Sequence, residues 1–227
     1  MKTAFITGSG RSGRTGRYLA DDLAAHGALP VLHCLEGASD ARRAVAELTG
    51  LGLASFWVQG DLCVPAEVAR VRDEVLRRAG NLDWLVHAVG SYRGRVRATN
   101  FDSAVLVCEA FLPHLSQGGR ILLFGAAGLG TGSEANPSDG EYLRAKKDLL
   151  RYMRELALRV VRRGITVNMI SPGEMEYSVV ERRDLPLGRR IRPDELCRAC
   201  RFLLDDGSAA ITGQNLEVAG GLDLLPS

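Results

Sequence analysis

The sequence has no excess of charge of either sign, few aromatic residues and no long apolar run. Among its 227 residues, 29 Lys and Arg are balanced by 27 Asp and Glu. This balance excludes a polybasic nucleic-acid-binding tail, and a hydrophobic share of 46% excludes an intrinsically disordered chain. Charged residues and glycines interrupt every apolar stretch before it reaches the roughly 20 residues of a membrane-spanning helix. We therefore expect a soluble globular protein that binds neither nucleic acid nor membrane.

Cysteine is also scarce, and its five positions are scattered and odd in number, which excludes a disulfide framework. The N-terminal segment becomes glycine-rich before the apolar core of a signal peptide develops. We therefore expect a protein of the reducing cytoplasm. Cys197 and Cys200 fall inside a helical pattern, and no second ligand pair lies at zinc-like spacing. The pair is interpreted as buried small hydrophobic residues, and no metal site is expected.

Short apolar and β-branched runs alternate with longer segments of helical period from one end of the chain to the other. This alternation predicts βαβ units and a parallel sheet. The predicted strands are residues 3–7, 30–35, 54–58, 84–89, 120–125, 166–171 and 215–218. No Pro- or Ser-rich linker divides the chain, so we expect a single domain comprising residues 1–227.

The clearest predicted helix runs from about residue 142 to residue 163, where apolar residues recur at steps of three and four. Two further helices are predicted to begin at Pro65 and Pro193, because proline is favoured in the first turn of a helix. Gly80 and Gly207 fall just past their predicted ends. One apolar stripe on each helix is expected to face the sheet.

A glycine-rich turn follows the first predicted strand. It reads Thr7-Gly8-Ser9-Gly10-Arg11-Ser12-Gly13-Arg14-Thr15-Gly16 and opens directly into a helical pattern. Glycines let the backbone approach a pyrophosphate, which the free N–H groups of a helix N-terminus then bind. Two other strand ends agree with this reading: Asp61-Leu62, suited to hold an adenine, and the small residues Ala88-Val89-Gly90. The alternative is a β-to-α turn that binds no ligand.

Tyr142 and Lys146 stand four positions apart at the start of the long predicted helix, and therefore on one face of it. The pKa of a free tyrosine is about 10, and an adjacent positive charge can lower it by roughly one to three units. The pair thus predicts a phenol that exchanges protons near neutral pH. A chance Y-x-x-x-K on a surface helix is the alternative.

These motifs occur in an order that resembles the short-chain dehydrogenase/reductase family over essentially the whole chain. The motifs that carry the resemblance are Thr7-Gly8 with Gly16, Asp61-Leu62, Ala88-Val89-Gly90, Thr99-Asn100, Tyr142-x-x-x-Lys146, residues 163–168, and Ser171-Pro172-Gly173. Residues 186–189 and 211–214 are similar to the tail of 3-oxoacyl-carrier-protein reductases. The resemblance implies an α/β fold: a Rossmann-type, doubly wound parallel sheet of about seven strands in three α/β/α layers.

The resemblance also implies roles for single residues. Tyr142 would protonate the carbonyl oxygen, Lys146 would bind the nicotinamide ribose and lower the tyrosine pKa, and Asn100 would hold a water for proton relay. Pro172 and Gly173 would shape the nicotinamide pocket. The residues expected to bind the cofactor are Gly8, Ser9, Arg11, Arg14, Thr15, Gly16, Asp61, Leu62, Ala88, Val89, Gly90, Lys146, Pro172 and Gly173.

The serine that polarises the substrate oxygen in this family is absent. Counting along the predicted strand puts Ala126 at its position, and counting back from Gly128 puts Gly125 there. The following loop is longer than usual and contains three hydroxyl residues, of which Ser133 is the weak favourite as a substitute. Without a substitute, the loss is comparable to that of an oxyanion-hole donor, about 2.7–4 kcal/mol.

The cofactor preference rests on three residues. Arg14 replaces the second glycine of the usual turn, as in the similar Arg-for-Gly form of pteridine reductases, and Arg11 lies nearby. Both guanidiniums could reach a 2′-phosphate or the pyrophosphate. Glu36, after the second predicted strand, argues mildly for the unphosphorylated ribose. NADP(H) is therefore preferred, and NAD(H) stays possible.

The segment between Gly90 and Asn100 is roughly a dozen residues shorter than usual, which should open one wall of the substrate cleft. Its three arginines at residues 93, 95 and 97 are interpreted as solvated surface residues, and binding of an anionic substrate is the alternative. His87, in place of the first Asn of the family motif, is interpreted as a hydrogen-bonded core residue.

The sequence thus predicts an NAD(P)H-dependent oxidoreductase that acts on a carbonyl or alcohol, such as a ketone or a 3-oxoacyl-like compound. Its expected partner is this small molecule, and the family resemblance implies further copies of the chain, in a dimer or in a tetramer with the long helices at one interface. The alternative is a dinucleotide-binding or ligand-sensing protein of the same fold in which catalysis is impaired. Retention of Tyr142, Lys146 and Asn100 favours the enzyme, and loss of the serine favours the sensor.

Overall fold

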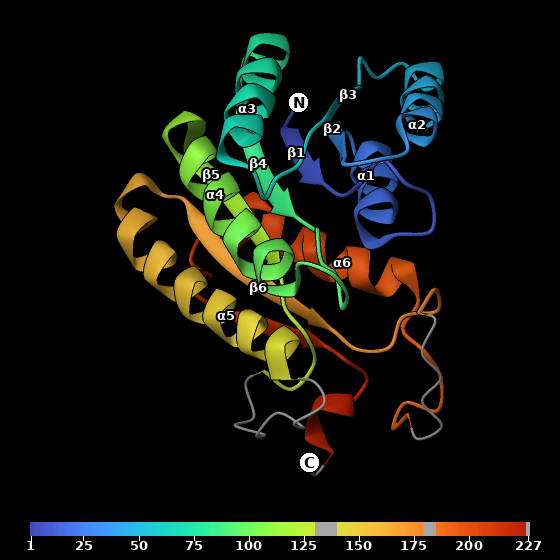
Figure 1. Ribbon diagram of the computed structural model, residues 1–227, viewed down its shortest axis with the longest axis vertical. Helices are drawn as coiled ribbons and strands as arrows, with labels where there is room; N and C mark the ends of the chain where they lie inside the picture. Colours follow the sequence, from blue (N-terminus) through green and yellow to red (C-terminus); the bar gives the residue numbers. More distant parts are fainter. Residues whose placement is uncertain (130–139, 179–184, 226–227) are drawn as a thin grey trace.

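A single parallel sheet organises the computed structural model, which describes residues 1–129, 140–178 and 185–225. Its strand order is β3-β2-β1-β4-β5-β6-β7 (Figure 1). The strands are β1 (Thr3–Thr7), β2 (Leu29–Cys34), β3 (Phe56–Gln59), β4 (Leu82–His87), β5 (Leu115–Phe124), β6 (Thr166–Pro172) and β7 (Asn215–Val218). All seven predicted strands are present in parallel register, which confirms the Rossmann-type α/β fold.

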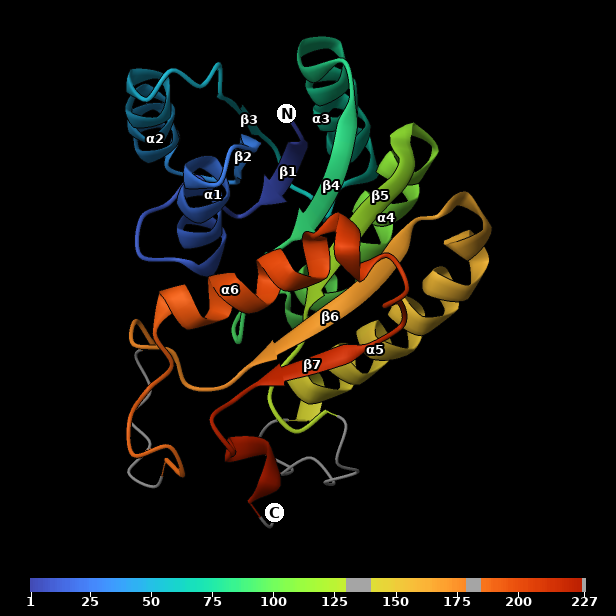
Figure 2. The same ribbon diagram turned by 180° about the vertical axis from the view of Figure 1, so that it is seen from behind.

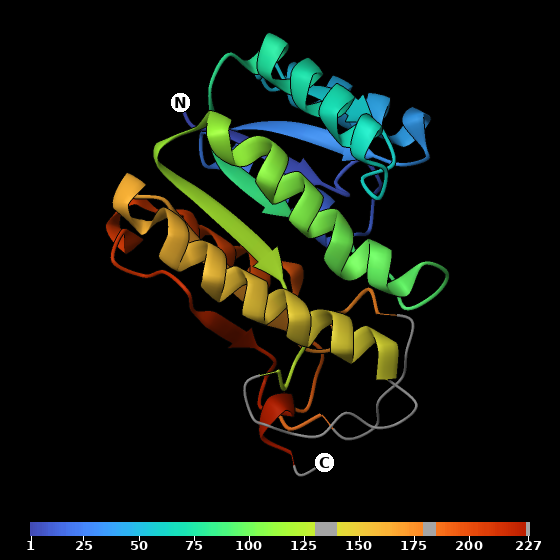
Figure 3. The ribbon, with the colours of Figure 1, turned by 60° about the vertical axis from the view of Figure 1, so that its left-hand side comes forward.

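Helices cover both faces of the sheet, which makes the three predicted layers. They are α1 (Thr15–Ala25), α2 (Ala38–Gly50), α3 (Pro65–Ala79), α4 (Ser103–Phe111), α5 (Gly140–Val160) and α6 (Pro193–Leu204). Figures 1 and 2 show α3, α4 and α5 on one face and α1, α2 and α6 on the other, and Figure 3 shows α3, α4 and α5 side by side along their face. As predicted, α3 and α6 begin at their prolines.

The two faces of the sheet bury two separate hydrophobic clusters, because successive side chains of a strand point to opposite sides. In β1, Phe5 belongs to the cluster beneath α3, α4 and α5, whereas Ala4 and Ile6 belong to the cluster beneath α1, α2 and α6. All three are fully buried. This burial on both sides explains why the strands read as continuous apolar runs rather than as alternating ones.

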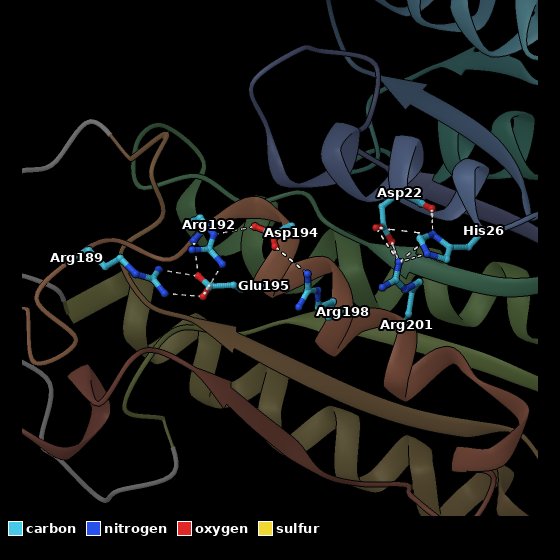
Figure 4. Close-up of polar contacts among 8 residues, drawn as sticks. All are labelled: Asp22, His26, Arg189, Arg192, Asp194, Glu195, Arg198 and Arg201. Carbon is cyan, nitrogen blue, oxygen red and sulfur yellow. Dashed lines mark hydrogen bonds and ion pairs between the residues drawn. The ribbon is translucent and has the colours of Figure 1, made fainter.

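Ion pairs attach α6 to its neighbours (Figure 4). Arg201 of α6 donates to both carboxylate oxygens of Asp22 in α1, at 2.9 and 3.0 Å. At the other end of the helix, Glu195 accepts hydrogen bonds from the side chain of Arg189 and from the backbone N–H of Arg192. Because Arg189 and Arg192 belong to the chain between β6 and α6, their contacts with Glu195 attach that chain to the start of α6.

The long predicted helix forms in slightly different bounds. α5 begins at Gly140 and ends at Val160, and a 3-10 turn over residues 161–163 leads into Gly164. Gly164 has φ +67°, a left-handed conformation that few other residues adopt. Cys197 and Cys200, on the buried face of α6, are 3% and 0% exposed, which confirms their interpretation as core residues. No helix in the described parts of the chain has the length and apolarity to cross a membrane.

The order of the strands reverses at β1, which lies between β2 and β4. In an open α/β sheet, a crevice forms at the carboxyl ends of the strands where the chain changes direction. Thr7 and His87, the last residues of β1 and β4, are partners in register there. The glycine-rich turn leaves β1 at this point, and the Ala88-Val89-Gly90 segment leaves β4 beside it.

Candidate active site

The glycine-rich turn makes two backbone contacts that a side chain would prevent. Gly8 has φ +67°, and a Cβ built there would lie 3.2 Å from Cγ2 of Val89. A Cβ on Gly16 would lie 2.9 Å from the carbonyl oxygen of Gly8. The first turn of α1 therefore packs directly against the end of β1. This close approach is the role that glycines have in dinucleotide-binding turns, where the helix N-terminus must lie near the pyrophosphate.

The N-terminus of α1 is free to bind an anion. Arg14 is its N-cap residue, no side chain caps the helix, and its first turn carries no acidic residue. Arg11 and Arg14 are exposed, and neither makes an ion pair with the residues that the structure describes. Thr15 contacts the hydroxyl of Tyr177 through its own hydroxyl at 2.5 Å. Uncapped N–H groups and two free guanidiniums thus meet at one helix end.

His33 in β2 is hydrogen-bonded to the glycine-rich turn. Its Nδ1 accepts a hydrogen bond from the N–H of Gly8 at 3.2 Å, so its proton lies on Nε2, which donates to the carbonyl of Gly60 at 3.0 Å. Its own carbonyl accepts from the N–H groups of Ser9 and Gly10. Burial lowers the pKa of His33 to about 4. The ring is therefore neutral at pH 7, and it joins the ends of β1, β2 and β3.

His87 sits at the centre of a second hydrogen-bonded chain. Ser103 donates its hydroxyl proton to the carbonyl of Thr99 and therefore accepts from Nε2 of His87, at 3.1 Å. Nδ1 then accepts from the hydroxyl of Thr7, which in turn accepts from the N–H of Ala88. Burial, and secondarily the charge of Lys146, lower the pKa of His87 to about 3. The prediction of a hydrogen-bonded core histidine is confirmed.

Lys146, Asn100 and Gly90 meet at the end of β4. Lys146 is 2% exposed, and its Nζ donates to the carbonyl oxygen of Phe124 at 2.8 Å. Asn100 is fully buried. A Cβ at Gly90 would lie 3.1 Å from Oδ1 of Asn100 and 3.7 Å from Nζ of Lys146. The absence of a side chain at Gly90 therefore lets the amide oxygen of Asn100 and the ammonium group of Lys146 approach the backbone at the end of β4.

The pKa of Tyr142 in α5 differs from the expectation, whereas Lys146 in the same helix has the charge that was expected at neutral pH. Burial lowers the pKa of Lys146 to about 8. The pKa of Tyr142 is raised well above its usual value rather than lowered, first by burial and then by the neighbouring phenol of Tyr92. Nζ of Lys146 lies 5.7 Å from the centre of the Tyr142 ring and is bound to Phe124, so its charge does not offset burial. In this state, the phenol of Tyr142 keeps its proton.

Asn100 lies in a π-helical turn, residues 98–102, a form found often at functional sites. Its Nδ2 donates to the carbonyls of Ser91 and Val96 at 2.6 and 2.8 Å, and its Oδ1 accepts from the N–H of Ser91 at 3.3 Å. Both amide hydrogens are thus committed to the preceding segment. Asn100 acts here as an anchor of that segment, and its expected role in holding a water stays a prediction.

The shortened segment, residues 91–97, contacts the start of α5 and the segment after β3. The ring of Tyr92 stacks on Tyr142, with ring centres 4.1 Å apart and an angle of 31° between the planes. Arg95 forms an ion pair with Asp61 at 2.5 Å, and Arg97 forms one with Asp148 at 2.7 Å. Two of the three arginines in this segment therefore form ion pairs with carboxylates of the same chain. Both side chains stay about half exposed, which agrees with the interpretation of surface arginines and adds an ion-pair partner to each.

Asp61 and Leu62 have different surroundings. The carboxylate of Asp61 is held by Arg95 and by the N–H of Cys63, which lower its pKa. Leu62 is 4% exposed and packs into the hydrophobic core below. Contacts from either residue to an adenine stay a prediction. At the other end of the crevice, a Cβ on Gly173 would lie 2.8 Å from the carbonyl oxygen of Ala219, so this glycine too permits close packing.

No hydroxyl occupies the position of the family serine. A Cβ at Gly125 would overlap Oγ of Ser171 and lie 2.7 Å from Sδ of Met169, so a side chain at residue 125 would displace both neighbours. Ala126 is partly buried and is the position that accepts a side chain. Ser133, the expected substitute, lies outside the described residues.

The residues at the carboxyl ends of β1 and β4 fit a nicotinamide dinucleotide. The uncapped end of α1, the close β1–α1 approach at Gly16 and the approach of Lys146 and Asn100 to Gly90 all lie at the carboxyl edge of the sheet. Three residues were missed by sequence reasoning: His33, Tyr92 and Tyr177. For the first two, the available signal was position alone, since both lie at or just after the carboxyl ends of strands beside the crevice.

Comparisons with known proteins agree with this arrangement. The sequence model of a family described as enoyl-(acyl carrier protein) reductase matches residues 15–223. The chain is 29% identical to the 3-oxoacyl-(acyl-carrier-protein) reductase FabG of Escherichia coli (strain K12) over 245 aligned residues, which cover 97% of each protein. It is 33% identical to carbonyl reductase family member 4 of Danio rerio over 185 residues, 73% of this chain and 76% of the relative.

Solved structures give the same result. A blue fluorescent protein from a metagenomic library, in complex with NADPH, superposes with a TM-score of 0.88 at 25% identity over 97% of each chain. A short-chain dehydrogenase from Burkholderia cenocepacia J2315, in complex with NADP, superposes with a TM-score of 0.86 at 26% identity over 96% of each chain.

Proposed function

This chain belongs to the short-chain dehydrogenase/reductase family, and we propose that it is a nicotinamide-dependent reductase of a carbonyl compound. The observation that carries the proposal is the meeting of Lys146, Asn100 and Gly90 at the end of β4. The side chains of Lys146 and Asn100 both approach Gly90, and Tyr142 stands one helical turn from Lys146. The family model, the relatives and the NADP-bound neighbours support the same reaction class.

A raised pKa keeps the proton on Tyr142 at neutral pH but makes its phenol a weaker acid, so donation depends on the charge that develops on the substrate oxygen and on the nearby ammonium of Lys146. At neutral pH its phenol is protonated and can give that proton to a carbonyl oxygen as the oxygen gains negative charge. The reduced nicotinamide supplies the hydride that the carbonyl carbon accepts. Lys146, whose pKa is near 8, carries a positive charge at neutral pH and stabilises the phenolate that remains. We assign the hydrogen bonding of the nicotinamide ribose to Lys146 as well.

For the cofactor, we propose NADP(H) in preference to NAD(H). Two observations support this preference. The guanidinium groups of Arg11 and Arg14 lie near the uncapped N-terminus of α1 and form no ion pair with the described residues. In addition, similar solved structures contain NADPH or NADP. Replacing Arg14 with alanine should weaken NADPH binding by about tenfold or more, the value of one charge-assisted hydrogen bond, and should change NADH binding less. Arg77→Ala, on the exposed surface of α3, is the control. Equal weakening of both cofactors would contradict the preference.

The reaction is tested by NADPH oxidation with a panel of ketones, quinones, 3-oxoacyl thioesters and pterins. We expect saturable binding of NADPH and turnover of at least one panel class. The 3-oxoacyl thioesters rank first, because the Escherichia coli relative is named for that substrate. Tight NADPH binding with no turnover of any class would instead support the ligand-sensing alternative, which Ala126 at the serine position favours.

We further propose a cytoplasmic homo-oligomer. The exposed outer surface near the end of α5 carries Leu158 and Val161, 80% and 45% exposed, which supports a contact between long helices of two copies. The five free cysteines support a reducing compartment. Light scattering of the purified protein should give the mass of a dimer or tetramer. Leu158→Glu should shift that mass toward the monomer, whereas an unchanged mass would place the interface elsewhere.

A further inference from the structure

A reductase of this family needs a hydrogen-bond donor beside the tyrosine, and the usual position offers none. At residue 125, the space for a side chain is already filled by Ser171, whose hydroxyl donates to Oδ1 of Asn215 at 2.7 Å. At residue 126, the side chain is a methyl group. The backbone of β5 thus ends beside Lys146 without a hydroxyl in either position.

A second phenol, that of Tyr92, lies against the proton donor. Its ring centre is 4.1 Å from that of Tyr142, and the two planes are 31° apart. Tyr92 comes from the segment after β4, whereas Tyr142 comes from the first turn of α5, so the contact joins two segments that are far apart in the sequence. Tyr92 is 74% exposed, so most of its surface is available to a bound molecule. The raised pKa of Tyr142, partly caused by Tyr92, agrees with close approach of the two phenols.

The backbone that carries Tyr92 is held on both sides. Before it, the carbonyl and the N–H of Ser91 both bind the side chain of Asn100. After it, the N–H and carbonyl of Arg93 bind the hydroxyl of Ser91 in a tight turn. The ion pair of Arg95 with Asp61 ties the far end of the turn to the segment after β3. Tyr92 therefore projects from a fixed turn rather than from a free loop.

We propose that Tyr92 supplies the hydrogen bond to the substrate oxygen that a serine supplies elsewhere in the family. This inference rests on the proposed carbonyl reduction. In that reaction, the carbonyl carbon gains a hydride and the oxygen gains the proton of Tyr142. Tyr92 shares its hydroxyl hydrogen with the same oxygen and retains it throughout, so it needs no further reactant. Asn100 acts as a positioning residue, because it holds the turn from which Tyr92 projects.

The first variant removes only the hydroxyl. Tyr92→Phe keeps the ring and its stacking on Tyr142, so the cleft keeps its wall. Loss of one oxyanion-hole donor lowers kcat by about 10²–10³-fold, and we expect a fall of that size with the Kd of NADPH unchanged. The control is Tyr18→Phe. Tyr18 lies in α1 and stacks on Tyr177, with ring centres 5.4 Å apart, so this variant also removes one hydroxyl from a stacked tyrosine pair. Its kcat should equal that of the wild type.

The second variant restores the family hydroxyl, and with the first it forms a double-mutant cycle. Ala126→Ser should raise kcat little in the wild type, because the donor is already present. In the Tyr92→Phe background it should raise kcat at least tenfold. If Tyr92 only packs against Tyr142, the two substitutions act independently, and Ala126→Ser changes kcat by the same factor in both backgrounds.

Each outcome decides the proposal. Loss of kcat in Tyr92→Phe with rescue by Ala126→Ser supports it. Wild-type kcat in Tyr92→Phe, measured where Tyr142→Phe is inactive, overturns it while leaving the reductase intact, and a loss in Ser133→Ala would then assign the donor to that residue. A wild-type protein that binds NADPH and reduces no panel member overturns the proposed function, and the role of Tyr92 with it.

Discussion

At Lys146, burial and charge oppose each other. The side chain is almost fully enclosed, and the carbonyl of Phe124 accepts one of its hydrogen bonds. Burial lowers its pKa to about 8, so at pH 7 most molecules carry the ammonium that the proposed reaction needs. Tyr142 is protonated across the same range, because its pKa is raised. Among this pair, Lys146 is therefore the group that titrates near neutral pH.

This difference predicts the pH profile of reduction. As pH rises through about 8, the free protein loses the positive charge of Lys146, and kcat/KM for the carbonyl substrate should fall about tenfold per pH unit. Lys146→Arg should be less active but should keep its charge, because arginine stays protonated, and its decline should move to higher pH. The measurement is kcat/KM from pH 6 to 10. An unmoved decline in the variant would assign the titration to another group.

The two buried histidines predict how stability varies with pH. Unfolded histidine protonates near pH 6.5, whereas the pKa values of folded His33 and His87 are about 4 and about 3. Between these limits the unfolded chain binds more protons, so the free energy of unfolding falls as pH falls. The fall approaches about 1.4 kcal/mol per pH unit for each histidine. Above pH 6.5 this contribution is constant.

Urea unfolding of His87→Asn at pH 7, 6 and 5 tests this dependence. Without one of the two histidines, the histidine part of the pH slope should be about half as steep as in the wild type. Val86→Ala, a fully buried neighbour in β4, should lower stability by about the same amount at every pH. A slope in His87→Asn equal to that of the wild type would contradict a neutral, buried His87.

The role of a residue could be predicted from the sequence where a sequence motif specifies that role. It could not be predicted where the role depends on contacts between distant segments. Tyr142 and Lys146 share a face because four residues make about one helical turn. Tyr92 contacts Tyr142 because the turn after β4 lies against α5, and Asn100 is hydrogen-bonded to the backbone of that turn. No local pattern in the sequence specifies this contact. The raised pKa of Tyr142 was missed for the same reason, since it depends on burial.

At the scale of elements, the junction of β1 and α1 depends on one glycine. A methyl group on Gly16 would lie 2.9 Å from the carbonyl of Gly8 and 3.0 Å from that of Thr7, both rigid backbone atoms. Gly16→Ala should therefore push α1 away from the sheet, lower the free energy of unfolding by about 1–3 kcal/mol and weaken NADPH binding. Thermal and urea unfolding with a fluorescence titration of NADPH measure both effects.

Gly50→Ala, near the end of α2, is the matched control. No atom lies within 4 Å of a Cβ built there, and its φ is not positive. Alanine favours a helix over glycine by up to about 1 kcal/mol, so this variant should be at least as stable as the wild type. If Gly16→Ala behaved in the same way, the close approach of α1 to β1 would not be required.

The strands were predictable because the central ones are buried on both faces and read as short apolar runs, whereas β3 and β7 at the sheet edges are partly exposed. The bounds agree within a few residues, and the largest difference is β5, which begins at Leu115 rather than at residue 120. Helix α4 was not predicted. Its sequence, residues 103–111, is apolar on most sides, and a π-helical turn precedes it. Neither feature gives the clear period that marked α5.

At the scale of the molecule, the strand order brings distant segments to one crevice. The glycine-rich turn after β1, the segment after β4 and the start of α5 meet there, although up to 138 residues separate Gly8 from Lys146. Parallel strands with crossover helices place all of these ends on one edge. The family resemblance predicted this edge correctly, and the shape of the shortened segment 91–97 could be learned only from the structure.

The most direct test of the proposed reduction compares the wild type with Tyr142→Phe. Both proteins are titrated with NADPH by fluorescence and then assayed for NADPH oxidation with the carbonyl that the wild type reduces. If Tyr142 gives its proton to the substrate oxygen, the variant binds NADPH with an unchanged Kd and loses turnover by at least about 10²–10⁴-fold. Equal turnover in the two proteins would contradict the assignment of Tyr142 as the proton donor.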